Sequence, residues 1–311
     1  MKSLSENSTR NIVVNWHLLE PCQFKCKYCY AEWAKAVLPE VYKDQLNSEA
    51  LIGHLAELRG RFDSVRLSFA GGEPLLDKNL PAKIGHAIRH GLDVSIITNG
   101  GLLTPMFVRE NARKISMLGV SIDSLNIETN LKIGRATRSG KPVNFRNLIG
   151  MLELAREINP DIDIKINTVV NRFNFDEDLS ALIDRVRPDK WKVLRVLPAT
   201  ERSRAEKISD AQFAAFRKRH VHFSCVQFED NECMKNSYLM IDPYGRFFFN
   251  KKPMGYGYSN PILKVGIWRA FAQIDFDEQK FVNRYVKEPV LTKTAGALRT
   301  TAVPVGDGAR L

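Results

Sequence analysis

The sequence predicts an α/β fold whose core is a partial (β/α)6 barrel, followed by a smaller α+β cap. Between residues 12 and 200, short β-type runs alternate with helical patterns, so that six strands are separated by helix-length connections. Strands connected in this way lie parallel, and their crossovers are right-handed by default, so we expect the sheet to curve toward a barrel. After residue 200 the alternation stops, and a hairpin pattern replaces it.

Each predicted strand is a short run rich in β-branched and aromatic residues. The six strands are expected at residues 11–19, 64–70, 93–100, 115–123, 163–171 and 190–199. The helices between them carry local signals: Ser48 as a cap, Gly91 at an end and Pro105 in a first turn. These helices are expected at residues 49–60, 80–91, 104–114, 143–158 and 176–186.

The remainder of the chain reads as a cap and two ends without regular structure. A helix is expected at residues 209–220, a hairpin at 237–250 that turns at residues 242–245, and two further helices at 261–273 and 277–287. We therefore predict a disordered N-terminus (1–11), a barrel (12–200), a cap domain (201–288) and a flexible tail (289–311).

Composition is that of a soluble globular protein, with 311 residues, 44% hydrophobic and 26% charged. No apolar run approaches the roughly 20 residues needed to span a bilayer, and the N-terminus is short and polar, so we expect a cytoplasmic protein with no membrane attachment. The net charge of +11 is compatible with a solvated basic surface or with a partner that carries phosphates. The positions of the cations must decide between the two.

Three of the five cysteines, Cys22, Cys26 and Cys29, lie within eight residues directly after the first predicted strand. A structural zinc site needs four protein ligands, and no fourth Cys or His follows at zinc spacing. Three thiolates are sufficient for an iron–sulfur cubane that keeps one iron open for an external ligand. The loop after the first strand of a parallel sheet is also where such folds place their chemistry. The sequence therefore predicts a [4Fe-4S] cluster on these cysteines.

The CxxxCxxC spacing, with Tyr28 before the last cysteine, resembles the signature of the radical S-adenosylmethionine enzymes. A second motif, "AGGEP", ends the second strand and resembles the family's GGE element at Gly71, Gly72 and Glu73. The resemblance implies that S-adenosylmethionine binds the open iron and is cleaved to a 5′-deoxyadenosyl radical. It assigns cofactor contacts to these three residues and to Tyr28, Asn99, Ser121 and Arg135, although Asn99 could equally be a plain turn residue.

Longer stretches resemble the viperin family: "NWHLLEPCQFKCKYCYA", "INTVVNRFN" with "KWKVLRVLPA", and "ECMKNSYLMIDPYGRFF". The similarity runs from about residue 12 to about residue 288. It implies a nucleotide dehydratase that removes hydrogen from C4′ of a nucleoside triphosphate (CTP, UTP or GTP) and then the 3′-hydroxyl. The product, a 3′-deoxy-3′,4′-didehydro nucleotide, lacks the hydroxyl that a polymerase extends, which implies an antiviral, anti-phage role.

Cations at strand positions that can point into the barrel agree with a polyanionic substrate, because a buried cation without a partner is very costly. Each of them taken alone could equally point outward into solvent. The resemblance implies a substrate-binding set of Arg66, Ser68, Lys165, Asn167, Lys192 and Asn231. It also implies that Tyr238, which could equally be packed hairpin core, lies near the sugar as the catalytic residue.

The expected partners are the nucleotide and an electron donor such as flavodoxin or ferredoxin, and we expect a monomer that binds no nucleic acid. One alternative is a radical enzyme of peptide or cofactor maturation; many of those carry extra clusters, for which only Cys225 and Cys233 remain. Another is a nucleotide- or RNA-binding protein with a structural metal site, but the aromatic platforms of RNA-binding modules are not visible.

Overall fold

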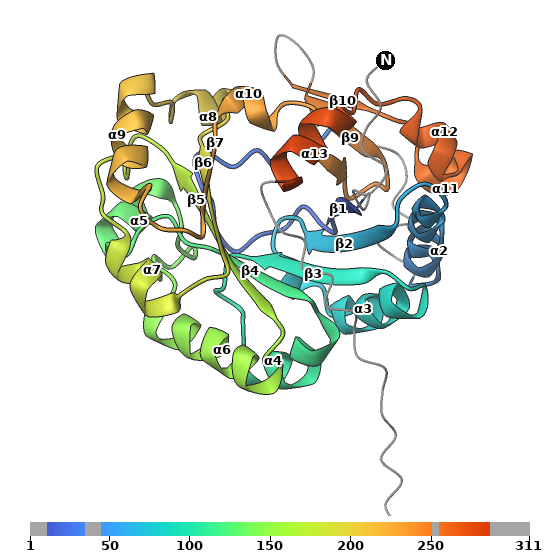
Figure 1. The fold of residues 1–311 in the computed structure, drawn as a ribbon, viewed down its shortest axis with the longest axis horizontal. Coiled ribbons are helices and arrows are strands. Elements are labelled where there is room, and N and C mark those ends of the chain that lie inside the picture. Colours follow the sequence, from blue (N-terminus) through green and yellow to red (C-terminus); the bar gives the residue numbers. More distant parts are fainter. Residues whose placement is uncertain (1–10, 35–44, 251–254, 287–311) are drawn as a thin grey trace, which may run out of the picture.

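The computed structural model describes residues 11–34, 45–250 and 255–286, and its strands form one sheet (Figure 1). Six parallel strands follow one another across the middle of this sheet: β1 (Asn11–His17), β2 (Ser64–Ala70), β3 (Asp93–Thr98), β4 (Met117–Ser121), β5 (Asp163–Val170) and β6 (Lys190–Arg195). Neighbouring members pair in parallel throughout. The predicted parallel α/β core is confirmed.

Helices cover the outer side of the curved sheet, as Figure 1 shows. They are α2 (Gln45–Ala56), α3 (Leu80–Arg89), α4 (Pro105–Asn111), α5 (Ile127–Ile133), α6 (Phe145–Ile158) and α7 (Ser180–Val186). Val65, Leu67 and Phe69 of β2 point to this side and are buried in the hydrophobic core. We call the opposite side, to which Ser68 and Lys192 point, the inner face.

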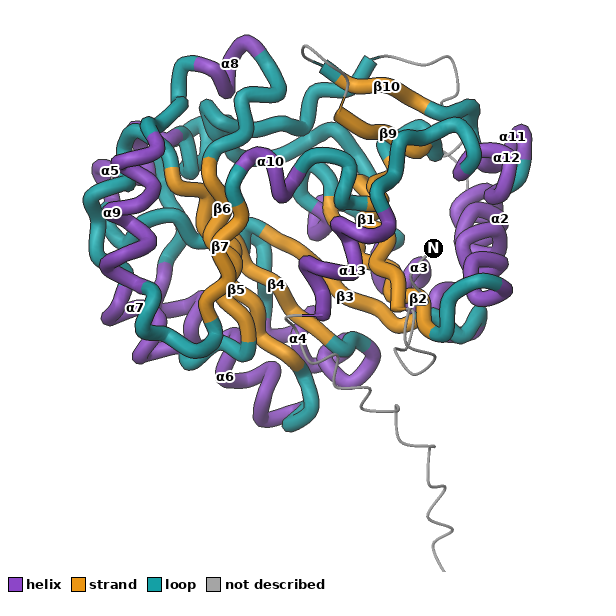
Figure 2. Tube along the Cα trace, turned by 45° about the horizontal axis from the view of Figure 1, so that its top comes forward, coloured by secondary structure: helices purple, strands orange, loops and turns teal. Residues whose placement is uncertain are grey.

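The later part of the chain adds strands to both edges of the same sheet. β7 (Val226–Glu229) pairs in parallel with β6, and β8 (Leu239–Ile241) pairs in parallel with β1. β9 (Phe247–Asn250) and β10 (Tyr256–Tyr258) continue antiparallel beyond β8, after the predicted turn, where the Gly245 N–H bonds Asp242 O at 3.0 Å. Strands β7 and β10 end the sheet on separate sides, so the barrel is open (Figure 2).

Short helices connect and cover these later strands. They are α8 (Glu201–Arg204), α9 (Asp210–His220), α10 (Asn231–Met234), α11 (Ile262–Val265), α12 (Ile267–Phe271) and α13 (Glu278–Val286). A domain boundary at residue 200 remains a prediction. The predicted tail and, apart from Asn11, the predicted disordered N-terminus lie outside the described residues. No helix in the described part of the chain has the length and apolar character that a membrane crossing requires.

Several local expectations were wrong or incomplete. Ser48 does not cap α2, because the helix begins at Gln45 and Ser48 is buried within it. The single helix expected at residues 261–273 is divided into α11 and α12 at Gly266, whose φ of +80° favours glycine. Helix α5 and strands β7 and β10 were not predicted, since each is short and has weak periodicity.

Candidate active site

The three clustered cysteines lie in the segment between β1 and α2, and we call residues 18–34 the cysteine loop. Three backbone hydrogen bonds join it to the "AGGEP" motif: Leu18 N–H donates to Ala70 O at 3.0 Å, Gly72 N–H donates to Leu19 O at 2.7 Å, and Glu73 N–H donates to Pro21 O at 3.0 Å. A Cβ atom on Gly72 would lie 2.0 Å from the Pro21 carbonyl oxygen. The glycine is therefore required by the close approach of two backbones, which brings the two motifs of the sequence together.

A second backbone seam joins the cysteine loop to the end of α5. Lys25 N–H donates to Gly134 O at 3.1 Å, and Lys27 N–H donates to Ile133 O at 2.8 Å. Gly134 ends α5 with a φ of +87°, and a Cβ there would lie 2.4 Å from the Lys25 carbonyl oxygen. The end of α5 thus holds the loop on both sides of its second cysteine, Cys26.

Two tyrosines of β10, and Arg246 directly before β9, hold the end of the cysteine loop. The Tyr256 hydroxyl donates to Tyr30 O at 2.8 Å, and Ala34 N–H donates to the Tyr258 hydroxyl at 2.9 Å. Arg246 donates from Nη2 to Ala34 O at 2.7 Å, and its guanidinium lies 4.1 Å from the centre of the Tyr258 ring. Strands β9 and β10 therefore help to position residues next to Cys29.

The three thiols are free and partly exposed. The Cys22 sulfur accepts hydrogen bonds from Asn99 Nδ2 at 3.5 Å and from Phe24 N–H at 3.4 Å. Burial raises the pKa of all three thiols, to about 12 for Cys26, so each is protonated at neutral pH and must release its proton to bind iron.

The donor set of these cysteines, three thiols with hydrogen bonds to sulfur, fits the ligands of an iron–sulfur cluster. Among the described residues, no three His, Cys, Asp or Glu side chains are close enough together to hold one metal ion. The ligands of a cubane bind different irons and so stand farther apart. Hydrogen bonds to sulfur, such as those on Cys22, are also typical of iron–sulfur sites.

Glu73 is buried, with 1% of its surface exposed, and its carboxylate is held by three donors. Thr98 Oγ1 and Leu75 N–H donate to Oε1 at 2.6 and 3.1 Å, and Asn99 N–H donates to Oε2 at 2.8 Å. Burial raises the pKa of this carboxyl above its ordinary value. The Asn99 side chain accepts from Gln23 Nε2 at 2.9 Å and donates to the Cys22 sulfur, so the structure brings Glu73, Asn99 and Cys22 into one network.

Arg135 also lies beside the cysteine loop, but its main partner was not predicted. Its guanidinium is 3.4 Å from the Asp123 carboxylate, donates to the Tyr28 hydroxyl at 3.2 Å and donates to Ser121 O. Tyr28 in turn donates to Asp123. The structure therefore brings Tyr28, Ser121 and Arg135 together around a buried carboxylate. Asp123 could have been recognised as a candidate from the sequence, because it lies directly after the carboxyl end of β4.

The strand cations predicted to bind substrate share the inner face. The register pairs Ser121 with Asn167 and Asn167 with Lys192, which places these three side chains in one row across β4, β5 and β6. Lys165 lies two residues before Asn167 on the same face. Arg66 lies near the amino end of β2, two residues before Ser68, and its Nε is buried without a hydrogen-bond partner in the described structure.

At the β6 edge, Lys192 and Tyr238 meet a residue that sequence reasoning missed, Glu229. Lys192 Nζ lies 2.7 Å from the Glu229 carboxylate and 3.3 Å from the Tyr238 hydroxyl, which donates to Glu229 at 2.5 Å. Lys192 and Glu229 are 2% and 1% exposed. Asn231 follows nearby at the start of α10, with a buried Oδ1 that has no partner in the described structure. Glu229 was missed because β7 was not predicted.

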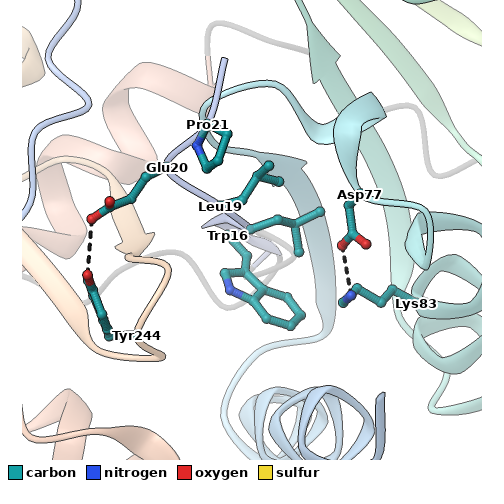
Figure 3. Close-up of a pocket in the computed structure, with 8 residues that line it drawn as sticks. Trp16, Leu19, Glu20, Pro21, Asp77, Lys83 and Tyr244 are labelled. Atoms are coloured by element: carbon teal, nitrogen blue, oxygen red, sulfur yellow. Dashed lines mark hydrogen bonds and ion pairs between the residues drawn. The ribbon is translucent and has the colours of Figure 1, made fainter. Parts of the chain in front are cut away.

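A cavity of about 350 Å³ lies behind the cysteine loop (Figure 3). Its polar walls are two pairs, Asp77–Lys83 at 2.7 Å and Glu20–Tyr244 at 3.1 Å. The indole of Trp16 lies between them. The first residues of the cysteine loop, Leu18 to Pro21, line this cavity, but none of the predicted site residues does.

Comparison with known proteins gives both a family and relatives. Residues 19–186 match the model of the Radical SAM superfamily. The chain is similar to an S-adenosylmethionine-dependent nucleotide dehydratase of Psychrobacter lutiphocae, at 39% identity over 295 residues, covering 92% of this chain and 98% of the relative. A protein of the same name from Oncorhynchus mykiss, RSAD2, is 33% identical over 301 residues, covering 90% of this chain and 81% of the relative.

Solved structures of similar fold include native anSMEcpe with bound AdoMet, at a TM-score of 0.61 and 13% identity, covering 88% of this chain and 83% of that chain. SuiB of Streptococcus suis bound to S-adenosylmethionine has a TM-score of 0.61 at 13% identity, covering 90% of this chain and 68% of that chain. Identities this low show a shared fold alone.

Proposed function

Because the chain belongs to the S-adenosylmethionine-dependent nucleotide dehydratases of the radical SAM superfamily, we propose that it dehydrates a nucleoside triphosphate to its 3′-deoxy-3′,4′-didehydro form. The observation that carries this proposal is the 39% identity over 98% of a curated dehydratase. The substrate would be CTP, UTP or GTP. Its C4′ hydrogen atom would pass to the 5′-deoxyadenosyl radical, and the 3′-hydroxyl would then leave as water with the uptake of one electron, from the reductant, and one proton. The product would terminate viral transcripts, in keeping with defence against phage.

In this proposal Cys22, Cys26 and Cys29 hold a [4Fe-4S] cluster. When bound, the cluster supplies the electron that splits the sulfonium of S-adenosylmethionine and so provides the 5′-deoxyadenosyl radical. The residues proposed to contact S-adenosylmethionine are Tyr28, Gly71, Gly72, Glu73, Asn99, Ser121 and Arg135. Their hydrogen bonds to one another and to the cysteine loop support this assignment, because a preorganised site loses little freedom on binding.

The proposed nucleotide site is the inner face of β2, β5 and β6. Arg66, Lys165 and Lys192 would neutralise the triphosphate, while Ser68, Asn167 and Asn231 would donate or accept hydrogen bonds. The buried Arg66 Nε and Asn231 Oδ1 support this, since a buried polar atom left without a partner costs about 1–3 kcal/mol, which a bound ligand would offset.

Tyr238 is proposed to act at the sugar. Its hydroxyl donates to Glu229 and is 3.3 Å from Lys192, so its orientation is defined before the substrate arrives. A hydroxyl between a carboxylate and an ammonium group is suited to hold a proton near the departing 3′-hydroxyl. We expect the protein to work as a cytoplasmic monomer, without nucleic acid, and to take electrons from flavodoxin or ferredoxin.

The test is anaerobic reconstitution followed by incubation with S-adenosylmethionine, a reductant and each of the four common ribonucleoside triphosphates. We expect one or more nucleotides to increase 5′-deoxyadenosine formation, with deuterium moving from C4′ of labelled substrate into the deoxyadenosine. A variant with all three cysteines changed to alanine is the control and should form none. If no nucleotide raises deoxyadenosine above background, the proposal is wrong, and an iron content well above about four per chain would favour a maturation enzyme instead.

A further inference from the structure

Large apolar side chains are exposed in unusual number around the carboxyl ends of β3 and β4. Of the ten such side chains in the described structure, five lie there: Leu102 and Met106 after β3, and Leu125, Ile127 and Leu131 after β4. Ile127 and Leu131 are 60% and 44% exposed and stand four residues apart, hence on one side of α5. A group of exposed apolar side chains with a polar border is typical of an interaction surface.

Both groups flank the cysteine loop. Ile133, at the end of α5, accepts a hydrogen bond from Lys27 N–H at 2.8 Å. On the other side, a Cβ on Gly101 would lie 3.0 Å from the Phe24 ring. The end of α5, two residues after Leu131, therefore lies directly beside the segment that carries Cys26.

Cations border the apolar side chains of α5. Lys25, Lys27 and Lys132 are exposed, and in the described part of the chain none has a carboxylate within 4.0 Å. Lys27 Nζ lies 4.9 Å from the centre of the Phe173 ring, and the Arg172 guanidinium lies 4.6 Å from the same ring. Glu128 is the one carboxylate on α5. Arg172 is paired with Glu206 at 2.9 Å, so the basic character of the border comes from the three lysines.

We propose that Ile127, Leu131, Lys25, Lys27 and Lys132 form a docking surface for an acidic one-electron carrier protein that reduces the cluster. This inference rests on the proposed function, because it needs a cluster on the adjacent cysteines. An apolar centre with a charged rim matches the usual anatomy of a transient interface, and opposite charge steers such partners together. In the transfer the carrier is oxidised by one electron and the cluster is reduced by one, with no bond formed and no proton moved.

Charge argues against the chain's own C-terminal residues as the occupant. Residues 287–311 contain four Lys or Arg and only two Asp or Glu side chains, so they would be repelled by the lysines. Nucleic acid would match the cations but not the exposed Ile127 and Leu131. An acidic protein with an apolar contact area satisfies both features.

The experiment compares two reductants on the same reconstituted enzyme. Leu131→Glu combined with Lys132→Glu reverses the charge at Lys132 and places a second carboxylate beside it, and Ile127→Ser combined with Leu131→Ser changes the apolar centre without changing any charge. The control, Lys264→Glu with Arg269→Glu, changes exposed cations on α11 and α12, on the opposite side of the molecule (Figure 1). Deoxyadenosine formation is measured with dithionite and with limiting reduced flavodoxin, and cluster bleaching by flavodoxin is followed by stopped flow.

We expect dithionite-driven rates to stay within about twofold in all variants, while flavodoxin-driven rates and bleaching fall about tenfold in both α5 variants only. Added salt should slow flavodoxin-driven reduction of the original protein more than that of the charge-reversed variant. Unchanged flavodoxin rates would overturn the inference, as would an equal loss with dithionite or in the control. Cluster bleaching is measured without nucleotide and so does not depend on dehydratase activity. If bleaching by flavodoxin slows in the α5 variants but the original protein dehydrates no nucleotide, only the proposed function is refuted.

Discussion

The buried pair Lys192–Glu229 allows a prediction whose size follows from the structure. The side chains are 3% and 2% exposed, and their charged atoms are 2.7 Å apart. Removing one partner of a buried ion pair costs about 3–5 kcal/mol, because the other charge stays out of water. Glu229→Leu also removes the acceptor of the Tyr238 hydroxyl. Because Lys192 keeps its contact with Tyr238, we expect a loss near the lower limit, about 3 kcal/mol of unfolding free energy.

The assay is denaturant unfolding of the cluster-free protein under anaerobic conditions. The double variant Lys192→Met with Glu229→Leu should recover to within about 1 kcal/mol of the original stability, because it removes both buried charges. The control is Glu153→Leu. Glu153 pairs with Arg185 at 2.9 Å, but these side chains are 49% and 64% exposed, so the loss should be below about 1 kcal/mol.

Two results would refute this reasoning. One is a loss below about 1 kcal/mol for Glu229→Leu, which would mean that water reaches the pair. The other is a double variant no more stable than the single one, which would mean that the carboxylate stabilises the fold through some contact other than Lys192.

Three further predictions concern the cysteine loop and its surroundings. Gly72→Ala should cost at least about 2 kcal/mol and lower cluster content, because its Cβ meets a backbone oxygen at 2.0 Å; Gly150→Ala, with nothing within 4 Å, should be neutral or slightly stabilising. Burial lowers the pKa of His17 from 6.5 to about 3. As the pH falls below 6.5, the unfolded chain therefore takes up a proton that the folded protein does not, and the free energy of unfolding decreases. Between pH 7 and pH 5 this loss is about 2 kcal/mol, and His17→Phe should remove it. Asp123→Asn should cost about 3 kcal/mol, measured by denaturant unfolding, because Arg135 loses its buried carboxylate.

Each of these has a contrary outcome. Equal stability and iron content of the two glycine variants would mean that the loop accommodates a methyl group. The control for the pH prediction is His54→Asn on α2. If His17→Phe and His54→Asn both lose as much stability between pH 7 and pH 5 as the original protein does, the loss comes from other groups. Full stability of Asp123→Asn together with normal cluster content would mean that Arg135 finds another partner.

Local sequence was sufficient for the features that depend on covalent spacing. Three thiols within eight residues occupy one loop whatever surrounds them, and alternation of apolar residues decides which side of a strand is buried. The six central strands were predicted for this reason. For Arg66, Lys165 and Lys192 the sequence left open whether each side chain points inward or outward, and the structure showed that they share one face. The pairing of "AGGEP" with the cysteine loop was expected only from the family resemblance, because two adjacent glycines taken alone are also typical of a plain turn.

Only the tertiary structure decided which distant residues meet. Asp123 joins Tyr28 from 95 positions away, and Glu229 joins Lys192 from 37 positions away, so neither contact leaves a periodic signal. The same holds for β7 and β8, which pair with opposite edges of the sheet. A short apolar strand fits any free edge, and its partner is chosen by the packing of the whole chain. The sequence alone therefore determined the cysteine cluster and the strand cations, while the curvature and register of the sheet determined which of these groups lie beside Asp123 or Glu229 and which share the inner face.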